Sequence, residues 1–250
     1  MSGEKLFGIP IFSGTYDDIV NEFKNSEYIQ LFSINAEIVM GAKKDASWLL
    51  SYKDNKTNHI DGYWIKKALE WKYKKKFEKI SGSDLISDVC DFANTHNKKI
   101  FLLGAKESVS IKAANEMRKT YPNIQLDRYS PSYNVKGMDV KENNIVLSMI
   151  HSNKPDIVIV CLGAPKQEKW IIENQSLLID NGVRITMGAG GTLDFISGEV
   201  KRAPLWVRNI GFEWLFRLII EPWRIKRQIT TLPIFILYAL FEIVSYRFKK

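Results

Sequence analysis

The sequence predicts an α/β protein with a Rossmann-like, mostly parallel sheet, flanking helices and a helical, basic and apolar C-terminal appendage. Continuous apolar runs such as Lys99–Gly104 and Ile157–Leu162 alternate with helical patterns over the first 200 residues. Such runs are typical of parallel strands covered on both faces, and their alternation with helices predicts right-handed βαβ units. Composition then changes, because residues 201–250 carry +7 of the formal net charge of +8. We therefore predict one domain over residues 1–197 and an appendage over residues 198–250.

The first third of the chain predicts three strands and three helices. Ile19 and Phe23 share one face at helical spacing, whereas Tyr28–Ile34 is an apolar run that fits a strand. The expected elements are a strand at Ile9–Phe12, a helix at Thr15–Phe23, a strand at Tyr28–Ile34, a helix from Ala36 to about Leu50, a short strand within Thr57–Gly62 and a helix at Tyr63–Tyr73.

The middle of the chain continues the same alternation. Ser83 or Asp84 is expected to cap one helix, and Pro165 has the fixed φ that suits the first turn of another. The expected helices are Leu85–Asn94, Glu107–Thr120, Val140–His151 and Pro165–Leu178, and the expected strands are Lys99–Gly104, Ile124–Tyr129, Ile157–Leu162 and Val183–Met187.

The appendage combines basic residues with aromatic and aliphatic ones. We expect one helix over Pro204–Glu221, with Trp206 and Trp214 on one face, and a second helix from about Trp223. A basic, aromatic segment attached to a nearly neutral body indicates an anionic surface as its partner.

Leu232–Phe241 is a run of ten apolar residues that ends at Glu242. A membrane span takes about 20 residues, so this run fits an interfacial segment lying on a bilayer. The alternative is packing against the body or against a second subunit, and a homo-oligomer is left open. No nucleic-acid-binding signature is present and the aromatics cluster with aliphatics, which favours lipid and predicts no nucleic-acid partner.

The remaining composition constrains compartment and chemistry. Cys90 and Cys161 lie in apolar patterns and are expected to be buried thiols in a reducing compartment. The N-terminus has no long apolar run, so we expect a cytoplasmic protein. The three histidines have no metal-type spacing with cysteines or acids, and we predict neither a metal nor a cofactor.

Polar residues follow two predicted strands near the N-terminus. Asp61 ends a short strand beside Gly62, which makes it a candidate general base; a chemically inert Asp-Gly turn is the alternative. Ser33 and Asn35 lie at a strand-to-helix switch, where the alternative role of Asn35 is to cap the helix.

A third strand end carries Gly163, Pro165, Lys166, Gln167 and Glu168. Helix N–H groups at the carboxyl edge of a parallel sheet favour anionic ligands, although an ordinary βα turn with solvated side chains is the alternative. The run Gly188–Gly191 has neither a GxGxxG fingerprint nor a Walker lysine. Its glycines, Gly190 among them, allow close backbone approach to a phosphate or sugar, or else tight helix–sheet packing.

Several segments, in this order, resemble the WecG/TagA/CpsF family of bacterial glycosyltransferases, glycosyltransferase family 26. The resemblance covers about residues 6 to 230, and its blocks beginning at Gly163 and Arg202 are specific. The matching segments are Asn35-Ala36-Glu37, Asp61-Gly62, Gly82-Ser83-Asp84, Gly163-Ala164-Pro165-Lys166-Gln167-Glu168, Arg202-Ala203-Pro204, Glu213-Trp214-Leu215-Phe216-Arg217, and Glu221-Pro222-Trp223-Arg224 to Arg227.

The resemblance implies an inverting, metal-independent glycosyltransferase of cell-surface polysaccharide synthesis. Its donor would be a UDP-sugar, typically UDP-N-acetylmannosamine or its uronic acid. Its acceptor would be undecaprenyl-diphosphate-linked N-acetylglucosamine. The appendage would dock on the inner face of the cytoplasmic membrane and complete the active site, which makes the protein cytoplasmic and peripheral.

The resemblance also implies roles for individual residues. Asp61 would be the base, and Gln167 would hold the sugar or diphosphate. Arg217, Arg224 and Arg227 would contact phosphate on the donor or on the lipid, and contact with lipid headgroups only is the alternative. The arginines would share one face if their helix continued past Pro222. The expected substrate-binding residues are Ser33, Asn35, Lys79, Gly82, Ser83, Asp84, Gly163, Pro165, Lys166, Glu168 and Gly190.

This chain departs from the family at two of these positions. Members usually carry threonine where Ser33 stands and often arginine where Lys79 stands; lysine keeps the charge but loses bidentate phosphate binding. A non-catalytic nucleotide-sugar-binding or scaffold protein of a polysaccharide assembly complex is the alternative function. A nicotinamide-dependent enzyme is disfavoured, because GxGxxG is missing after the first strand.

Overall fold

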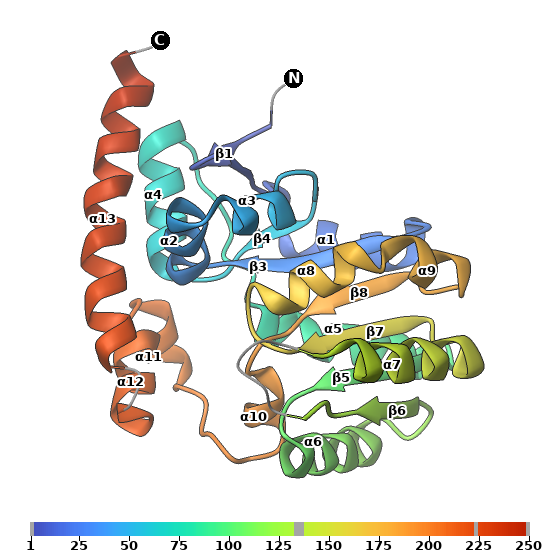
Figure 1. Cartoon of the computed structure of the whole chain (residues 1–250). Coiled ribbons are helices and arrows are strands. Elements are labelled where there is room, and N and C mark those ends of the chain that lie inside the picture. The colour runs from blue at the N-terminus through green and yellow to red at the C-terminus, as the bar shows by residue number, and fades with distance from the viewer. Residues whose placement is uncertain (1–2, 133–137, 223–224, 249–250) are drawn as a thin grey trace. The chain divides into compact units, whose positions relative to one another are not determined.

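The computed structural model describes residues 3–132, 138–222 and 225–248 (Figure 1). It confirms the α/β class, because six strands within these residues form one sheet in the order β4-β3-β8-β7-β5-β6. The strands are β3 (Ile29–Ile34), β4 (Asn58–Ile60), β5 (Lys99–Gly104), β6 (Gln125–Tyr129), β7 (Ile157–Cys161) and β8 (Ile185–Gly188). Neighbours from β3 to β6 pair in parallel, as helical crossovers require.

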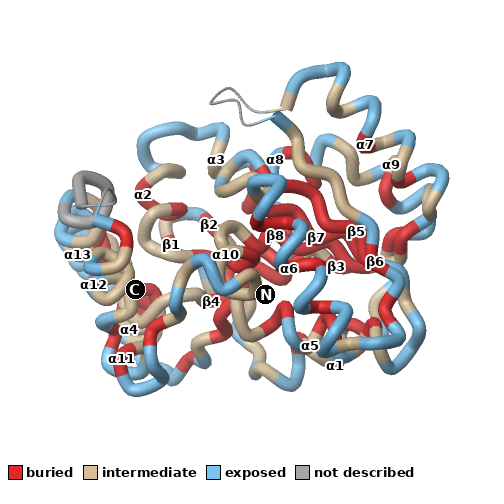
Figure 2. Tube along the Cα trace, turned by 90° about the horizontal axis from the view of Figure 1, so that it is seen from below, coloured by how far each residue is buried: buried red, intermediate tan, exposed pale blue. Residues whose placement is uncertain are grey.

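The centre of the sheet is the apolar core. Ile159 of β7 is in register with Leu102 of β5 on one side and with Met187 of β8 on the other. Every residue of β7 is buried, and Figure 2 shows buried residues concentrated on β5, β7 and β8. A strand buried on both faces has no polar side, which is why a continuous apolar run identified it.

The chain forms two compact units, of which the second comprises residues 19–32 and 82–200. The predicted helix Pro165–Leu178 is wrong in one respect, because Asn174 interrupts it with φ −106° and ψ 8°. The predicted caps Ser83 and Asp84 instead lie inside a helix that begins at Gly82. The helices here are α5 (Gly82–Thr95), α6 (Glu107–Thr120), α7 (Val140–Asn153), α8 (Lys166–Glu173), α9 (Gln175–Asp180) and α10 (Thr192–Ile196).

The first unit comprises residues 1–18, 33–81 and 201–250. The single helix expected up to Leu50 is two helices, because Asp45 adopts an extended backbone and its carboxylate accepts the N–H of Ser47 at 2.8 Å. Its N-terminal elements are the hairpin strands β1 (Lys5–Leu6) and β2 (Ile9–Pro10), then α2 (Ala36–Lys44), α3 (Ala46–Tyr52) and α4 (Tyr63–Tyr73), while α1 (Tyr16–Asn25) continues into the second unit.

The C-terminal segment of the first unit differs from its prediction in one way. The helix expected over Pro204–Glu221 is two helices, α11 (Leu205–Asn209) and α12 (Glu213–Ile220), separated at Gly211 with φ 85°. A Cβ at Gly211 would lie 2.6 Å from the ring of Tyr63, so glycine lets this turn pack against α4. The final helix, α13 (Ile225–Phe248), begins near the predicted start and runs for 24 residues, past the end of the apolar run Leu232–Phe241.

One side of α13 packs against α4 and α2, which run beside it in Figure 1. Phe235, Ala239 and Ile243 are buried on that side. An opposite stripe is exposed and apolar, and it consists of Leu237, Leu240, Phe241, Val244 and Phe248. Thr230–Phe248 has a mean hydropathy of 1.4 over 19 residues, which by length and composition alone is enough to cross a membrane. This stretch extends beyond the ten-residue run Leu232–Phe241 at both ends and includes Glu242.

Candidate functional site

Asp61 directly follows β4 in the first unit, as predicted. Its N–H donates to the carbonyl of Ile34 at 2.9 Å, which ties the end of β4 to the end of β3. Gly62 then turns the chain into α4 with φ 124° and ψ 141°, a conformation that disfavours residues with a side chain. The Asp-Gly pair therefore fixes a partly buried carboxylate at a strand end.

The pKa of Asp61 is raised to about 6, well above its ordinary value of 3.8. Burial is the main cause, and the carboxylate of Glu213 adds to it. The charges of Lys79 and Arg202 and a hydrogen bond from Ser81 oppose the rise. A carboxylate with such a pKa is mostly ionised at neutral pH and yet is a stronger base than an ordinary aspartate.

The groups around Asp61 come from two stretches of the first unit. Lys79 and Ser81 follow α4, whereas Arg202 and Glu213 belong to the C-terminal segment. Arg202 Nη2 donates to Ser81 Oγ at 3.4 Å, and Lys79 Nζ donates to the carbonyl of Arg208 at 3.4 Å. The C-terminal segment therefore supplies charge to the surroundings of the candidate base.

Ser33 and Asn35 lie on either side of the end of β3. The Oδ1 of Asn35 accepts the N–H of Ile38 at 3.0 Å, so the alternative role, capping of α2, is confirmed. The Oγ of Ser33 lies 3.3 Å from Nε2 of His59, a fully buried residue whose Nδ1 lies 2.8 Å from the carbonyl oxygen of Ile80. Substrate binding by Ser33 and Asn35 stays a prediction.

Gln167 organises the candidate residues of the second unit. Its Oε1 accepts the N–H of Gly163 at 3.2 Å and the N–H of Gly190 at 2.9 Å, and its Nε2 donates to Glu168 at 2.8 Å. The side chain thus joins the turn after β7 to the loop after β8. Gln167 and Glu168 are both buried, whereas Lys166 is exposed.

The glycines of the second unit serve different purposes. A Cβ at Gly188 would lie 2.9 Å from both Gln167 Nε2 and Glu168 Oε1, so this glycine permits close packing of β8 against α8. Gly163 and Gly190 have φ of 78° and 53° and open space where a Cβ would be. These two glycines, with Pro165 after a cis peptide bond, shape a polar strand edge, and a ligand there stays a prediction.

The predicted loop Gly82-Ser83-Asp84 forms the first turn of α5. Gly82 is buried, and Ser83 Oγ lies 3.5 Å from Thr192 Oγ1 at the start of α10. This contact places the start of α5 beside the loop that holds Gly190. Substrate binding by these three residues stays a prediction.

The three predicted arginines are not brought together on one described helical face. Arg217 Nε donates to Glu221 at 2.7 Å within the first unit. The helix ends at Ile220, close to the expected end, and Glu221 has φ −121° and ψ 71°. The condition under which the arginines would share one face, a helix that continues past Pro222, is therefore not met. Arg224 lies outside the described residues, as does the side chain of Arg227.

Sequence reasoning missed four residues around Asp61: His59, Ser81, Arg202 and Glu213. Arg202 and Glu213 belong to motifs that carry the family resemblance, and that was the signal available for them. No local pattern in the sequence indicated a role for His59, because its partners Ser33 and Ile80 are 26 and 21 residues away in the chain. Within the described parts of the chain, no three His, Cys, Asp or Glu side chains gather as metal ligands would.

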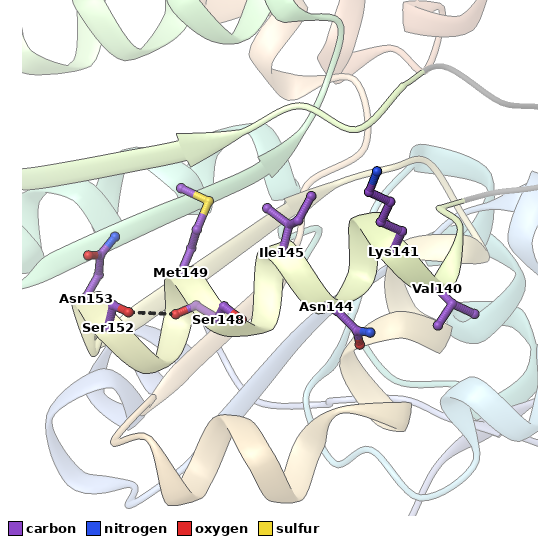
Figure 3. Close-up of a pocket in the computed structure, with 8 residues that line it drawn as sticks. All are labelled: Val140, Lys141, Asn144, Ile145, Ser148, Met149, Ser152 and Asn153. Carbon is purple, nitrogen blue, oxygen red and sulfur yellow. Dashed lines mark hydrogen bonds between the residues drawn. The ribbon is translucent and has the colours of Figure 1, made fainter.

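A hollow also lies along the outer side of α7 (Figure 3). All eight lining residues belong to this one helix, and they are Val140, Lys141, Asn144, Ile145, Ser148, Met149, Ser152 and Asn153. Ser152 Oγ donates to the Ser148 carbonyl at 2.9 Å, an ordinary intrahelical bond. None of the candidate site residues that the structure describes lines this hollow.

Comparison with known proteins agrees with the motifs. The model of the Glycosyl transferase WecG/TagA/CpsF family matches residues 4–249. A protein of Bacillus subtilis (strain 168), named N-acetylglucosaminyldiphosphoundecaprenol N-acetyl-beta-D-mannosaminyltransferase, is 32% identical over 97% of this chain and 93% of its own length. Proteins of the same name from Staphylococcus aureus strains MRSA252 and NCTC 8325 are 29% identical over 88% of this chain and 83% of their own lengths. The chain therefore belongs to the WecG/TagA/CpsF family of glycosyltransferases.

Proposed function

We propose that this protein transfers N-acetylmannosamine, or a closely related sugar, from a UDP-sugar to undecaprenyl-diphosphate-linked N-acetylglucosamine, with inversion and without a metal ion. The names of the relatives support the transferred sugar and the lipid-linked acceptor. The product is a lipid-linked disaccharide for a cell-surface polysaccharide.

The observation that carries the proposal is the environment of Asp61. Inversion in one displacement needs a base that removes the proton of the acceptor hydroxyl as the new bond forms. Asp61 lies at a strand end, partly buried, and its pKa is raised to about 6 by burial and by Glu213. At pH 7 about nine-tenths of such a group is ionised, so it is ready to accept that proton.

Departure of UDP places negative charge on its diphosphate, and this charge needs fixed cations or N–H donors in the transition state. In the first unit, Lys79, Arg202 and Arg217 are the described cationic candidates. In the second unit, the N–H groups at the start of α8 follow the Gly163 turn and suit an anionic group. We assign the UDP moiety to that turn and loop, which Gln167 joins.

We also propose that α13 holds the enzyme on the inner face of the cytoplasmic membrane without crossing it. Its exposed stripe is apolar, whereas its other side packs on α4 and α2. Glu242 lies within the apolar stretch and is paired with Lys72 of α4. A helix that keeps this contact cannot be surrounded by lipid, so it fits the interfacial orientation of an amphipathic anchor.

A turnover assay tests the proposed reaction. The full chain is incubated with a prenyl-diphosphate-linked N-acetylglucosamine and UDP-N-acetylmannosamine, its uronic acid or UDP-N-acetylglucosamine, with and without EDTA. We expect a β-linked lipid disaccharide and stoichiometric UDP from the mannosamine-type donor, at a rate that EDTA does not change. Tight UDP-sugar binding without any product would instead support the non-catalytic alternative, and loss of activity in EDTA would remove metal independence.

A further inference from the structure

His59 joins three segments of the first unit that carry candidate site residues. It lies in β4, two positions before Asp61, and its side chain is fully buried. Its Nδ1 lies 2.8 Å from the Ile80 carbonyl oxygen, next to Lys79, and its Nε2 lies 3.3 Å from Ser33 Oγ at the end of β3. The imidazole therefore bridges the strand end that holds Ser33 and the segment that follows α4.

The partners of this ring determine where its proton lies. A carbonyl oxygen can only accept a hydrogen bond, so Nδ1 carries the proton and donates it to Ile80. Burial lowers the pKa of His59 to about 4, against the opposing effect of the Ile80 carbonyl, so the ring is neutral at physiological pH. Nε2 of this tautomer is an acceptor, and the hydroxyl of Ser33 must donate its hydrogen to it.

The bond to His59 uses the hydrogen that Ser33 carries. A serine hydroxyl has one hydrogen and two lone pairs, so Ser33 keeps only accepting capacity for a ligand. Phosphate oxygens at neutral pH accept hydrogen bonds, whereas sugar hydroxyls and amide N–H groups can donate them. The partly buried Ser33 is thus suited to a donating group and unsuited to a phosphate oxygen.

We propose that His59 is a positioning residue that fixes the Ser33 hydroxyl as an acceptor for a hydroxyl or amide N–H of the transferred sugar. This deepens the proposed function and rests on the expected role of Ser33 as a substrate-binding residue. The surrounding backbone supports a rigid arrangement, because Asp61 N–H donates to Ile34 at 2.9 Å and Ile80 N–H donates to Ile60 at 2.8 Å. Because these backbone hydrogen bonds hold the strand ends in place, the side chain of His59 determines only the orientation of the Ser33 hydroxyl.

A double-mutant cycle tests the coupling. His59→Asn keeps an amide N–H that can reach the Ile80 carbonyl but is too short to reach Ser33. We expect His59→Asn and Ser33→Ala each to raise the KM for the UDP-sugar by roughly five- to tenfold, the size of one hydrogen bond, with kcat changed less. In the double variant the loss should equal that of one single variant, because both remove the same interaction. Losses that multiply would overturn the proposal, as would a Ser33→Thr variant that is as impaired as Ser33→Ala.

Two measurements without turnover separate this inference from the proposed reaction. In ¹⁵N NMR spectra of histidine-labelled protein, His59 should be the Nδ1-protonated neutral tautomer; an Nε2-protonated ring would refute the inference and leave the reaction untouched. By calorimetry, Ser33→Ala should weaken UDP-N-acetylmannosamine binding by roughly five- to tenfold and leave UDP binding unchanged. An equal loss for UDP would place Ser33 on the nucleotide and contradict the proposal. If UDP-sugar binding changes as expected but no turnover is detected, the proposed reaction is refuted and the inference about His59 and Ser33 is not.

Discussion

Lys72 of α4 forms an ion pair with Glu242 of α13, 170 residues further along the chain. Lys72 is only 8% exposed, and its ammonium also donates to the carbonyl of Lys5 at 2.8 Å. Glu242 also accepts the N–H of Phe7 at 3.0 Å. The pair thus fastens the last helix to α4 and to the N-terminal hairpin within the first unit.

Removing one partner of this pair should destabilise the first unit more than removing both. Glu242→Leu leaves a buried ammonium without its carboxylate, and we expect it to lower the free energy of unfolding by about 2 kcal/mol. The double variant Lys72→Met/Glu242→Leu should recover most of that loss, because two apolar side chains need no partner. Urea denaturation measures both values. Additive losses in the double variant would show that the two side chains do not act as a pair.

The exposed stripe of α13 should carry membrane binding. Leu237 and Phe241 are 68% and 72% exposed, so replacing both with aspartate removes apolar contact with lipid without disturbing the fold. Each side chain contributes about 1.5–3 kcal/mol when buried in an apolar phase, so we expect binding to anionic liposomes to fall by well over tenfold. Val140→Asp, at a 77% exposed position of α7, is the matched control. Liposome binding that is unchanged in the Leu237/Phe241 variant would rule out the proposed anchor.

Gln167 should matter for the fold as well as for activity. Gln167→Ala leaves the N–H groups of Gly163 and Gly190 without their shared acceptor. Each N–H group that water does not reach should lower the free energy of unfolding by about 1–3 kcal/mol. We expect a melting temperature lower by about 2–4 °C for each kcal/mol lost, together with weaker UDP binding. Calorimetry of folding and of UDP binding gives both numbers. A variant with wild-type stability and weak UDP binding would mean that Gln167 contacts the ligand directly and does not stabilise the turn at Gly163 and the loop at Gly190.

The parallel core could be predicted from the sequence, and the helix breaks could not. β5 (Lys99–Gly104) has the predicted bounds because a strand buried on both faces is apolar throughout. The interruptions at Asp45, Asn174 and Gly211 depend on local caps and on one contact with Tyr63, which periodicity does not reveal. The apolar run Leu232–Phe241 ends at Glu242 but α13 continues to Phe248, and the ion pair of Glu242 with Lys72 is a long-range contact that the sequence does not reveal.

The candidate base could be predicted, whereas its surroundings could not. Asp61 follows a strand and precedes a glycine, a local pattern that the sequence displays. Its neighbours Lys79, Arg202 and Glu213 come from segments up to about 150 residues away, and only the fold brings them to one carboxylate. The cap bond of Asn35 could be predicted, because an asparagine directly before a helix is a common N-cap.

Asp61→Asn should abolish transfer and stabilise the fold. The loss of a general base lowers kcat by about 10²- to 10⁴-fold, while UDP affinity stays within about threefold. Because the folded-state pKa of about 6 exceeds the ordinary value of 3.8, the ionised carboxylate opposes folding above pH 6. The variant should therefore be about 3 kcal/mol more stable than wild type at pH 8, and the difference should vanish below about pH 4.

The exposed Asp54 of the same unit provides the control for that substitution. Asp54→Asn should leave turnover and the free energy of unfolding unchanged, since its side chain is exposed to solvent in the folded protein. Full activity in Asp61→Asn would remove Asp61 as the base. Equal stability of Asp61→Asn and wild type at pH 8 would show that the carboxylate is not held in the environment described.

The most direct measurement is the pH dependence of kcat/KM for the wild type, Glu213→Gln and Lys79→Met. The wild type should lose activity about tenfold per pH unit below an apparent pKa of about 6. Glu213→Gln removes a charge that raises this pKa, so its acid limb should move to lower pH, whereas Lys79→Met should move the limb to higher pH. An acid limb that is absent between pH 5 and 7, or that neither substitution moves, would contradict Asp61 as the base of this transferase.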